Sequence, residues 1–324
     1  MSDYRYSLAP YTGMNSRYRC PSCGDKDKTF TLYIDNETGE PIHQDVGRCS
    51  REIKCGYHYS PKQYFHDHDI AFDAPDDDYY LIRNNPKPKS IPKPTSFILK
   101  ETLKGTLKHY DSNHLVTYFR RLFGSANTEK LIAKYYIGSA KKWEGGTVFW
   151  QIDIEGKIRT GKIMLYNSET GKRVREPFSH VTWVHSELKL PDYELKQCFF
   201  GEHLLREKTM PVAIVESEKT AIISSVYLPE YIWLAAGSIS NLNAEKCAVL
   251  KGRKVILFPD LNGYDKWKTK AMELSSDISF SGSSKFSVSV SSLLERNANK
   301  DDREQGYDLA DYLVEYDWRE FVVE

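Results

Sequence analysis

The 324-residue sequence predicts a multidomain protein that combines α/β and α+β parts. Three observations predict this organisation. Four of the six cysteines lie within the first 55 residues, a tract rich in Pro and Lys follows them, and apolar runs alternate with helical patterns after residue 209. Strands that alternate with helices are typical of a parallel sheet with crossover helices. We predict four segments, at residues 1–70, 71–96, 97–208 and 209–324.

Composition alone indicates no partner, because 45 Lys and Arg residues balance 45 Asp and Glu residues. No run reaches the length of about 18 apolar residues that a membrane-spanning helix needs. The N-terminal Met-Ser-Asp-Tyr-Arg-Tyr has no apolar segment of the kind found in secretory signals. We therefore expect a cytoplasmic protein that does not contact membranes, with its cysteines as thiols or metal ligands rather than disulfides.

The N-terminal segment, residues 1–70, has the cysteine pattern of a structural metal site. Two pairs of thiols provide the predicted ligands: Cys20, Cys23, Cys49 and Cys55. The second pair is separated by five residues, which is wider than usual, so His43 or His58 is an alternative to one of its members. Four thiolates form the standard closed Zn²⁺ site, and a segment this small and polar cannot fold on an apolar core alone. We expect a β-ribbon that holds one structural Zn²⁺, whereas Cys198 and Cys247 should be core residues.

Residues 71–96 are predicted to be a linker. An acidic patch at residues 76–78 precedes a Pro- and Lys-rich tract at residues 86–94. Such a tract favours an extended polyproline conformation and cannot form a helix or a central strand. A recognition motif for a partner is the alternative to a spacer.

Residues 97–208 are predicted to form a mixed, basic α+β subdomain with a helix from residue 113 and strands near 147–153 and 158–166. Residues 141–175 contain eight cationic and four acidic side chains, a local charge of +4. Six cations are candidates for binding nucleic acid or nucleotides: Lys141, Lys142, Arg159, Lys162, Arg173 and Arg175. Five aromatic residues are interleaved or close by: Trp143, Phe149, Trp150, Tyr166 and Trp183. Their rings could line a groove for single-stranded nucleic acid, or they could form the hydrophobic core beneath the β-strands.

The last segment, residues 209–324, is predicted to contain a parallel sheet. Its strands are four apolar runs, at residues 211–215, 231–236, 254–258 and 286–290. Its helices are predicted at residues 219–227, 266–276 and 309–316.

Acidic residues follow two of these strands. Glu216 comes directly after the first strand, Asp260 follows the third, and Asp308 begins the last helix. Ligands of a parallel sheet bind at the carboxyl ends of its strands, where these acids would meet. Carboxylates that face one another repel unless a divalent cation lies between them, and hard oxygen ligands favour Mg²⁺ or Mn²⁺. Taken alone, Asp308 could simply cap its helix.

These acids lie in motifs that resemble a known family. The run from Val215 to Ala221 around Glu216 resembles the glutamate motif of TOPRIM domains, which occur in DnaG-type primases, type IA and type II topoisomerases and some nucleases. Asp260-Leu-Asn262 resembles the Asp-x-Asp motif, and Tyr-Asp308-Leu-Ala-Asp311 resembles the segment that closes the domain in primases. The segments at 135–138, 145–150, 153–156 and 161–162 are similar to the basic subdomain of bacterial primases. An N-terminal zinc ribbon also fits the domain order of these primases. Primase-like proteins of this build are common on plasmids and conjugative elements.

The resemblance implies a Rossmann-like TOPRIM sheet and a primase-like nucleotidyltransferase that uses nucleoside triphosphates and single-stranded DNA. Glu216, Asp260 and Asp308 would be catalytic, and together with Asn262 they would hold Mg²⁺ or Mn²⁺. The ribbon would help to select the template, and replication or conjugation proteins could be partners. The sequence departs from the family at Asn262, a neutral ligand in place of an acid, and in the wide spacing of Cys49 and Cys55. Two alternatives stay open, a TOPRIM nuclease and a catalytically lapsed accessory protein for single-strand binding or mobilisation.

Overall fold

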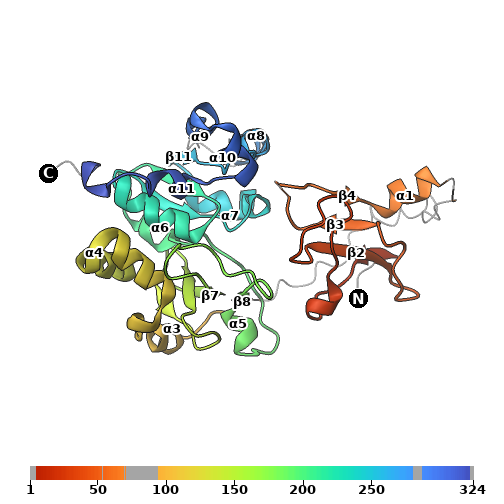
Figure 1. Cartoon of the computed structure of the whole chain (residues 1–324), viewed down its shortest axis with the longest axis horizontal. Helices are drawn as coiled ribbons and strands as arrows, with labels where there is room; N and C mark the ends of the chain where they lie inside the picture. Colours follow the sequence, from red (N-terminus) through yellow and green to blue (C-terminus); the bar gives the residue numbers. More distant parts are fainter. Residues whose placement is uncertain (1–4, 53, 69, 71–93, 280–286, 322–324) are drawn as a thin grey trace. The chain divides into compact units, whose positions relative to one another are not determined.

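The structure is a computed structural model, and it describes residues 5–52, 54–68, 70, 94–279 and 287–321. The chain forms two compact units, Met1–Lys93 and Pro94–Glu324 (Figure 1). Most of the predicted linker lies outside the described residues. The two segments that were predicted at 97–208 and 209–324 both fall within the second unit. Within the described part of the chain, no helix is both long and apolar enough to span a bilayer.

The first unit is built on a small antiparallel sheet in the order β1-β2-β3-β4. Its strands are β1 (Tyr6–Leu8), β2 (Phe30–Asp35), β3 (Gly47–Cys49) and β4 (His58–Tyr59). A short 3₁₀ turn, η1 (Met14–Ser16), follows β1, and helix α1 (Pro61–Asp67) follows β4. Ser60 and Gln63 form a capping box that begins α1. The core of this unit is small: the buried hydrophobic side chains among its described residues are Cys20, Phe30, Leu32, Val46 and Cys49.

The second unit begins with an antiparallel sheet in the order β5-β6-β7-β8. Its strands are β5 (Gly138–Ser139), β6 (Thr147–Ile152), β7 (Ile158–Met164) and β8 (Val181–Trp183). The helices around it are α3 (Lys100–Thr106), α4 (His114–Tyr135) and α5 (Val184–Glu187). Asn113 caps α4 by accepting a hydrogen bond from the backbone N–H of Val116, and its side-chain amide donates to the carbonyl of Gly138. One buried polar residue thus joins the helix to the sheet.

The rest of the second unit contains the predicted parallel sheet, in the order β10-β9-β11-β12. Its strands are β9 (Val212–Val215), β10 (Ile232–Ala235), β11 (Lys254–Leu257) and β12 (Ser287–Val290). Its helices are α6 (Glu218–Tyr227), α7 (Ala244–Cys247), α8 (Tyr264–Ser279), α9 (Leu293–Asn297), α10 (Lys300–Gln305) and α11 (Leu309–Leu313). The 3₁₀ turns of the unit are η2 (Tyr110–Ser112), η3 (Glu202–Arg206), η4 (Ile239–Asn241), η5 (Ala248–Leu250) and η6 (Trp318–Glu320). Strands β9 and β10 are buried along their whole length, as expected for strands covered on both faces.

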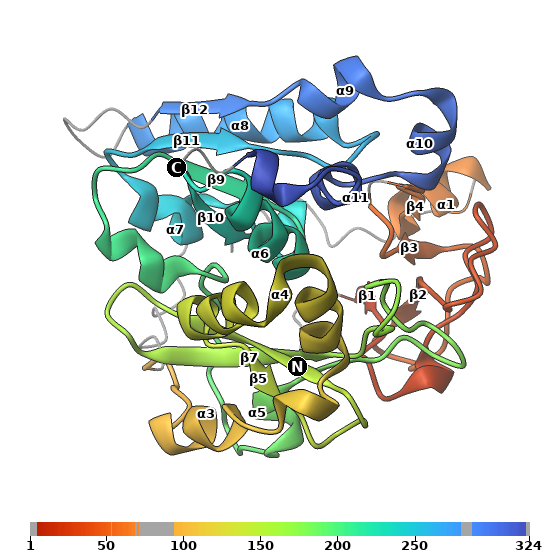
Figure 2. The ribbon, with the colours of Figure 1, turned by 60° about the vertical axis from the view of Figure 1, so that its left-hand side comes forward.

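The two sheets of the second unit share one hydrophobic core. Residues of α4, β6, α6, β9 and α11 belong to the same buried cluster. Figure 2 shows α4 between β7 and α6. Phe200 bridges to Ala235 of β10, and its ring stacks on that of Tyr135 from α4, with 5.3 Å between the centroids. The shared core fixes the position of the basic subdomain relative to the parallel sheet.

Candidate metal centre and acidic edge

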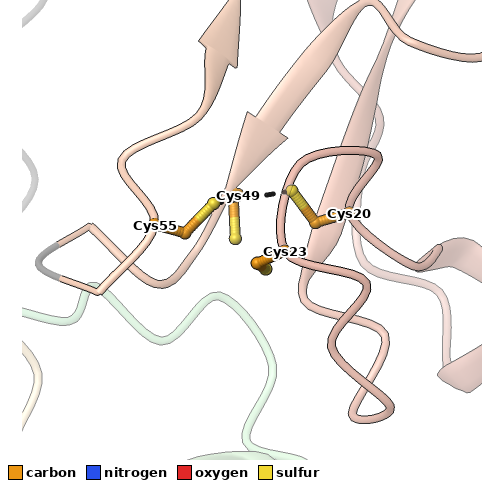
Figure 3. A group of neighbouring side chains, drawn as sticks. All are labelled: Cys20, Cys23, Cys49 and Cys55. Atoms are coloured by element: carbon orange, nitrogen blue, oxygen red, sulfur yellow. Dashed lines mark hydrogen bonds between the residues drawn. The ribbon is translucent and has the colours of Figure 1, made fainter. Parts of the chain in front are cut away.

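The four predicted zinc ligands lie together in the first unit (Figure 3). Their sulfur atoms are all within 4.8 Å of one another, and the sulfurs of Cys20 and Cys55 are 3.6 Å apart. A tetrahedral Zn²⁺ with Zn–S bonds of about 2.3 Å separates its sulfurs by about 3.8 Å, so the cluster has the right size for this ion. The alternatives at histidine are wrong: Nε2 of His58 is 2.9 Å from the hydroxyl of Tyr33, and the ring of His43 stacks on Tyr64.

The backbone explains how the wide spacing of the second pair is accommodated. The N–H groups of Cys55 and Gly56 both donate to the carbonyl of Arg51. These hydrogen bonds hold Cys55 close to Arg51, which lies two residues after Cys49 at the end of β3. Gly24 and Gly56, each directly after a cysteine, have φ values of 62° and 66°, a left-handed conformation that glycine adopts without steric cost.

The thiols of the cluster differ in acidity because their surroundings differ. Burial raises the pKa of Cys49 to about 12. Burial also raises the pKa of Cys55, but hydrogen bonds from the N–H of Tyr57 and from the neighbouring thiols outweigh it and lower the pKa to about 7. Zinc binds thiolates, so a dication would be needed to hold all four groups in their charged form.

The acids that follow the strands are brought to one edge of the parallel sheet. Glu216 directly follows β9, and the neighbouring strand β11 leads into Asp260, with the N–H of Phe258 still donating to the carbonyl of Ile214 in β9. Asp308 reaches the same edge through two contacts. The N–H of Leu261 donates to the carbonyl of Tyr307 at 2.9 Å, and the hydroxyl of Thr220 donates to Oδ2 of Asp308 at 2.6 Å. We call Glu216, Asp260 and Asp308 the acidic edge.

The acidic edge is looser than the cysteine cluster. Among the described residues, only the four cysteines form a group of three or more potential ligands whose atoms are all within 4.8 Å of one another. The carboxylate oxygens of Glu216, Asp260 and Asp308 are therefore not all within 4.8 Å of one another.

Asp308 has a structural task as well. Its Oδ1 accepts a hydrogen bond from the N–H of Asp311, and its own N–H donates to Oδ2 of Asp311, which together form the capping box of α11. Burial raises the pKa of Asp311 and the charge of Asp308 raises it further, whereas Lys219 and Lys172 lower it. Two cations from different segments are thus close to the acidic edge. Neither lysine is among the predicted binding residues, although Lys219 lies within the glutamate motif.

Asn262 lies in the turn before α8, two residues after Asp260, in a left-handed conformation with φ of 68°. Its side-chain amide donates to the carbonyl of Arg303 at 2.6 Å, and its backbone N–H donates to Glu295 at 3.2 Å. These contacts attach Asn262 to helices α9 and α10. Asp265, the next acidic residue along the chain, is exposed in the first turn of α8.

Lys162, Arg159 and Lys142, which are among the predicted binding cations, form ion pairs. Nζ of Lys162 in β7 lies 3.1 and 3.2 Å from the two carboxylate oxygens of Glu218, which is only 3% exposed. Nε of Arg159 donates to the buried Asp153 at 2.8 Å. Lys142 pairs with Glu187 at 3.0 Å on the surface. The Lys162–Glu218 pair links β7 to the start of α6, next to the acidic edge. Lys141, Arg173 and Arg175 are exposed on loops.

The aromatic residues of the basic segment divide into two groups. Phe149, Trp150 and Tyr166 are fully buried in the core, so for these three the interpretation as a binding groove is wrong. Every residue of β6 is buried. Phe149 and Trp150 therefore belong to the core, although charged residues lie close to them in the sequence. Trp143 and Trp183 are only partly buried.

Comparison with known proteins gives two family matches. Residues 113–261 match the model of a family described as a domain of unknown function, DUF6371, and residues 4–70 match that of a zinc β-ribbon finger. No curated protein matches the chain. The match and the four clustered sulfurs support a zinc ribbon with a structural Zn²⁺ in the first unit.

Among solved structures, the chain is similar to DnaG-type primases. One is the primase fragment of the bacteriophage T7 primase-helicase, with 13% identity, 90% of this chain and 98% of that chain covered, and a TM-score of 0.35. Another comprises the zinc-binding and RNA polymerase domains of the Aquifex aeolicus primase, with 15% identity, 97% and 78% covered, and a TM-score of 0.37. A third is the RNA polymerase domain of the Mycobacterium tuberculosis primase, with 12% identity, 65% and 66% covered, and a TM-score of 0.35. Identities and TM-scores this low carry no functional conclusion by themselves.

Proposed function

We propose that this chain is a primase-like nucleotidyltransferase that joins nucleoside triphosphates on a single-stranded DNA template with Mg²⁺ or Mn²⁺. The observation that supports the proposal is the acidic edge: Glu216 and Asp260 follow two adjacent parallel strands, and Asp308 accepts a hydrogen bond from Thr220 of α6. Parallel sheets bind their ligands at this edge. In this reading the sheet is of the TOPRIM type.

Glu216, Asp260 and Asp308 would hold the cation, with Asn262 contributing only if its amide oxygen turns toward it. A bound Mg²⁺ would offset phosphate charge and orient the triphosphate relative to the attacking hydroxyl. Lys172 and Lys219 lower the pKa of Asp311, which lies next to this edge. Their positive charges would also attract a triphosphate to this edge. The ion pair of Lys162 with Glu218 keeps the residues after Glu216 in place.

The exposed cations Lys141, Arg173 and Arg175 would contact the phosphates of the template, joined by Lys142 at the surface. Arg159 and Lys162, which were predicted to do the same, instead support the fold around this surface. We propose that the zinc ribbon helps to select the template, and that the protein acts in the cytoplasm as part of a plasmid or conjugative element, with replication or conjugation proteins as partners.

One observation favours a second function. The side-chain amide of Asn262 is already engaged by the carbonyl of Arg303, and an amide is a weaker ligand for Mg²⁺ than a carboxylate. A chain whose site has lapsed in this way would bind single-stranded DNA as an accessory protein without joining nucleotides.

One assay separates these functions. The zinc-loaded full chain is incubated with single-stranded DNA, labelled nucleoside triphosphates and Mg²⁺ or Mn²⁺. We expect short labelled oligonucleotides that require both template and metal. Degradation of the DNA without incorporation would instead identify a nuclease, and retention of the DNA with neither reaction would identify the accessory protein.

A further inference from the structure

A buried threonine holds the carboxylate of Asp308. Thr220 lies in the first turn of α6 and is fully buried, and its hydroxyl donates to Oδ2 of Asp308 at 2.6 Å. Asp308 is only half-buried, at the start of α11. The two residues are 88 positions apart in the sequence, so this hydrogen bond joins the segment that follows Glu216 to the segment that closes the sheet.

A second buried threonine shows what a helical hydroxyl does when it serves only its own helix. Thr128 in α4 is also fully buried, and its hydroxyl donates at 2.8 Å to the carbonyl of Gly124, four residues earlier. This is a common local bond of threonine in helices. For Thr220 the corresponding carbonyl is that of Glu216, which accepts the N–H of Gly237. The hydroxyl of Thr220 thus binds a carboxylate from another helix rather than its own backbone.

The hydrogen bond from Thr220 acts on the carboxylate itself, whereas the backbone contacts position only the main chain. The N–H of Leu261 donates to the carbonyl of Tyr307 at 2.9 Å, which keeps the chain before Asp308 beside the chain after β11. Of the two carboxylate oxygens, Oδ1 accepts the N–H of Asp311 in the cap of α11. Oδ2 accepts the hydroxyl of Thr220. Both oxygens are therefore held in a defined direction.

These two hydrogen bonds leave Asp308 able to bind a cation. A carboxylate has about four lone-pair positions, two on each oxygen, and the two hydrogen bonds occupy one on each. Groups that hydrogen-bond to a metal-binding carboxylate orient it, and their loss typically lowers metal affinity about 10- to 100-fold. The hydroxyl of Thr220 has the position of such a group.

We propose that Thr220 is a positioning residue of the acidic edge, which holds the carboxylate of Asp308 in the orientation that binds a divalent cation. Thr220 would touch neither the cation nor a substrate, and it would act only through Asp308. This inference rests on the proposed function, because the cation at the acidic edge is part of that function. Cation binding itself requires neither a template nor nucleotide joining, so it can be measured separately.

The test measures the affinity of the zinc-loaded full chain for Mn²⁺, from the electron paramagnetic resonance signal of unbound Mn²⁺. Thr220→Val keeps the shape of the side chain and removes the hydroxyl, so it should weaken Mn²⁺ binding by about 10- to 100-fold. Thr220→Ser keeps the hydroxyl and should bind Mn²⁺ with nearly the affinity of the wild type. If Thr220→Val does not fold, Thr220→Ala removes the same donor without placing a methyl group beside the carboxylate, and it should show the same loss.

The matched control is Thr128→Val. It removes a fully buried hydroxyl from the same unit, but one that is bonded to backbone rather than to an acid. Both valine variants should lose some thermal stability, because each loses a buried hydrogen bond. Only Thr220→Val should lose affinity for Mn²⁺, a result that a merely structural role would not produce.

Wild-type Mn²⁺ affinity in folded Thr220→Val or Thr220→Ala would overturn the positioning role. An equal loss of affinity in Thr220→Ser or in Thr128→Val would overturn it too, as would the absence of Mn²⁺ uptake by the wild type.

The two proposals fail in different ways. Weak Mn²⁺ binding by Thr220→Val, in a protein whose wild type binds Mn²⁺ but synthesises no oligonucleotide, would uphold the positioning role and refute the polymerase. Template-dependent synthesis by the wild type, together with unchanged Mn²⁺ affinity in Thr220→Val, would do the reverse.

Discussion

Glu216→Gln should abolish oligonucleotide synthesis. The substitution keeps the size of the side chain at the end of β9 but removes one of the three negative charges of the acidic edge. We expect the rate of incorporation to fall by about 100- to 1,000-fold, as is typical when one preorganised group that stabilises charge is lost. The measurement is the incorporation of labelled nucleoside triphosphates on a single-stranded template in the presence of Mg²⁺.

A matched control is available on the same sheet. Glu230 is exposed and lies just before β10, at the amino end of the strands, so Glu230→Gln removes the same charge from the opposite edge. It should keep nearly full activity. Glu216→Gln should also retain its affinity for single-stranded DNA, because the exposed cations are unchanged. Activity in Glu216→Gln close to that of the wild type would refute a catalytic acidic edge.

Cys49→Ser should remove the zinc and unfold the first unit. Two of the five buried hydrophobic side chains among the described residues of this unit, Cys20 and Cys49, are themselves predicted ligands, so the apolar contribution to its stability is small. Structural zinc sites contribute about 10–16 kcal/mol in comparable small modules, far more than such a core could replace. Atomic emission should fall from about one zinc per chain to nearly none, a stoichiometry expected for a four-thiolate site. Limited proteolysis should then digest residues 1–93 while the second unit persists.

The control for this prediction is a cysteine outside the cluster. Cys247 is buried in the core of the second unit, near Trp267 and Leu250. Cys247→Ala should therefore keep its zinc, with a modest loss of stability from the smaller side chain. A fully folded, metal-free preparation of the wild type would show that the cysteines do not form a structural zinc site.

Much of the fold could be predicted because it depends on local patterns. The strand predicted at 211–215 is β9, the one at 254–258 is β11, and Glu216 and Asp260 follow them in the expected order. Strands buried on both faces are continuous apolar runs, which are readily recognised in a sequence. The cysteine cluster could be predicted for a similar reason, since thiols spaced for a metal are rare by chance.

The remaining features depend on contacts between distant segments. The pair of Lys162 with Glu218 joins residues 56 positions apart, so the charge of Lys162 looked available for phosphates. The orientation of Asn262 is likewise set by Arg303, on a helix that follows much later in the chain.

The most direct test of a divalent-cation site at the acidic edge is the binding of Mn²⁺ to the zinc-loaded chain, followed by electron paramagnetic resonance. We expect the signal of unbound Mn²⁺ to decrease saturably with the wild type and with Glu230→Gln, and this uptake to disappear in Glu216→Gln. Equal uptake by the wild type and Glu216→Gln, or none by the wild type, would contradict the assignment of the cation to Glu216, Asp260 and Asp308.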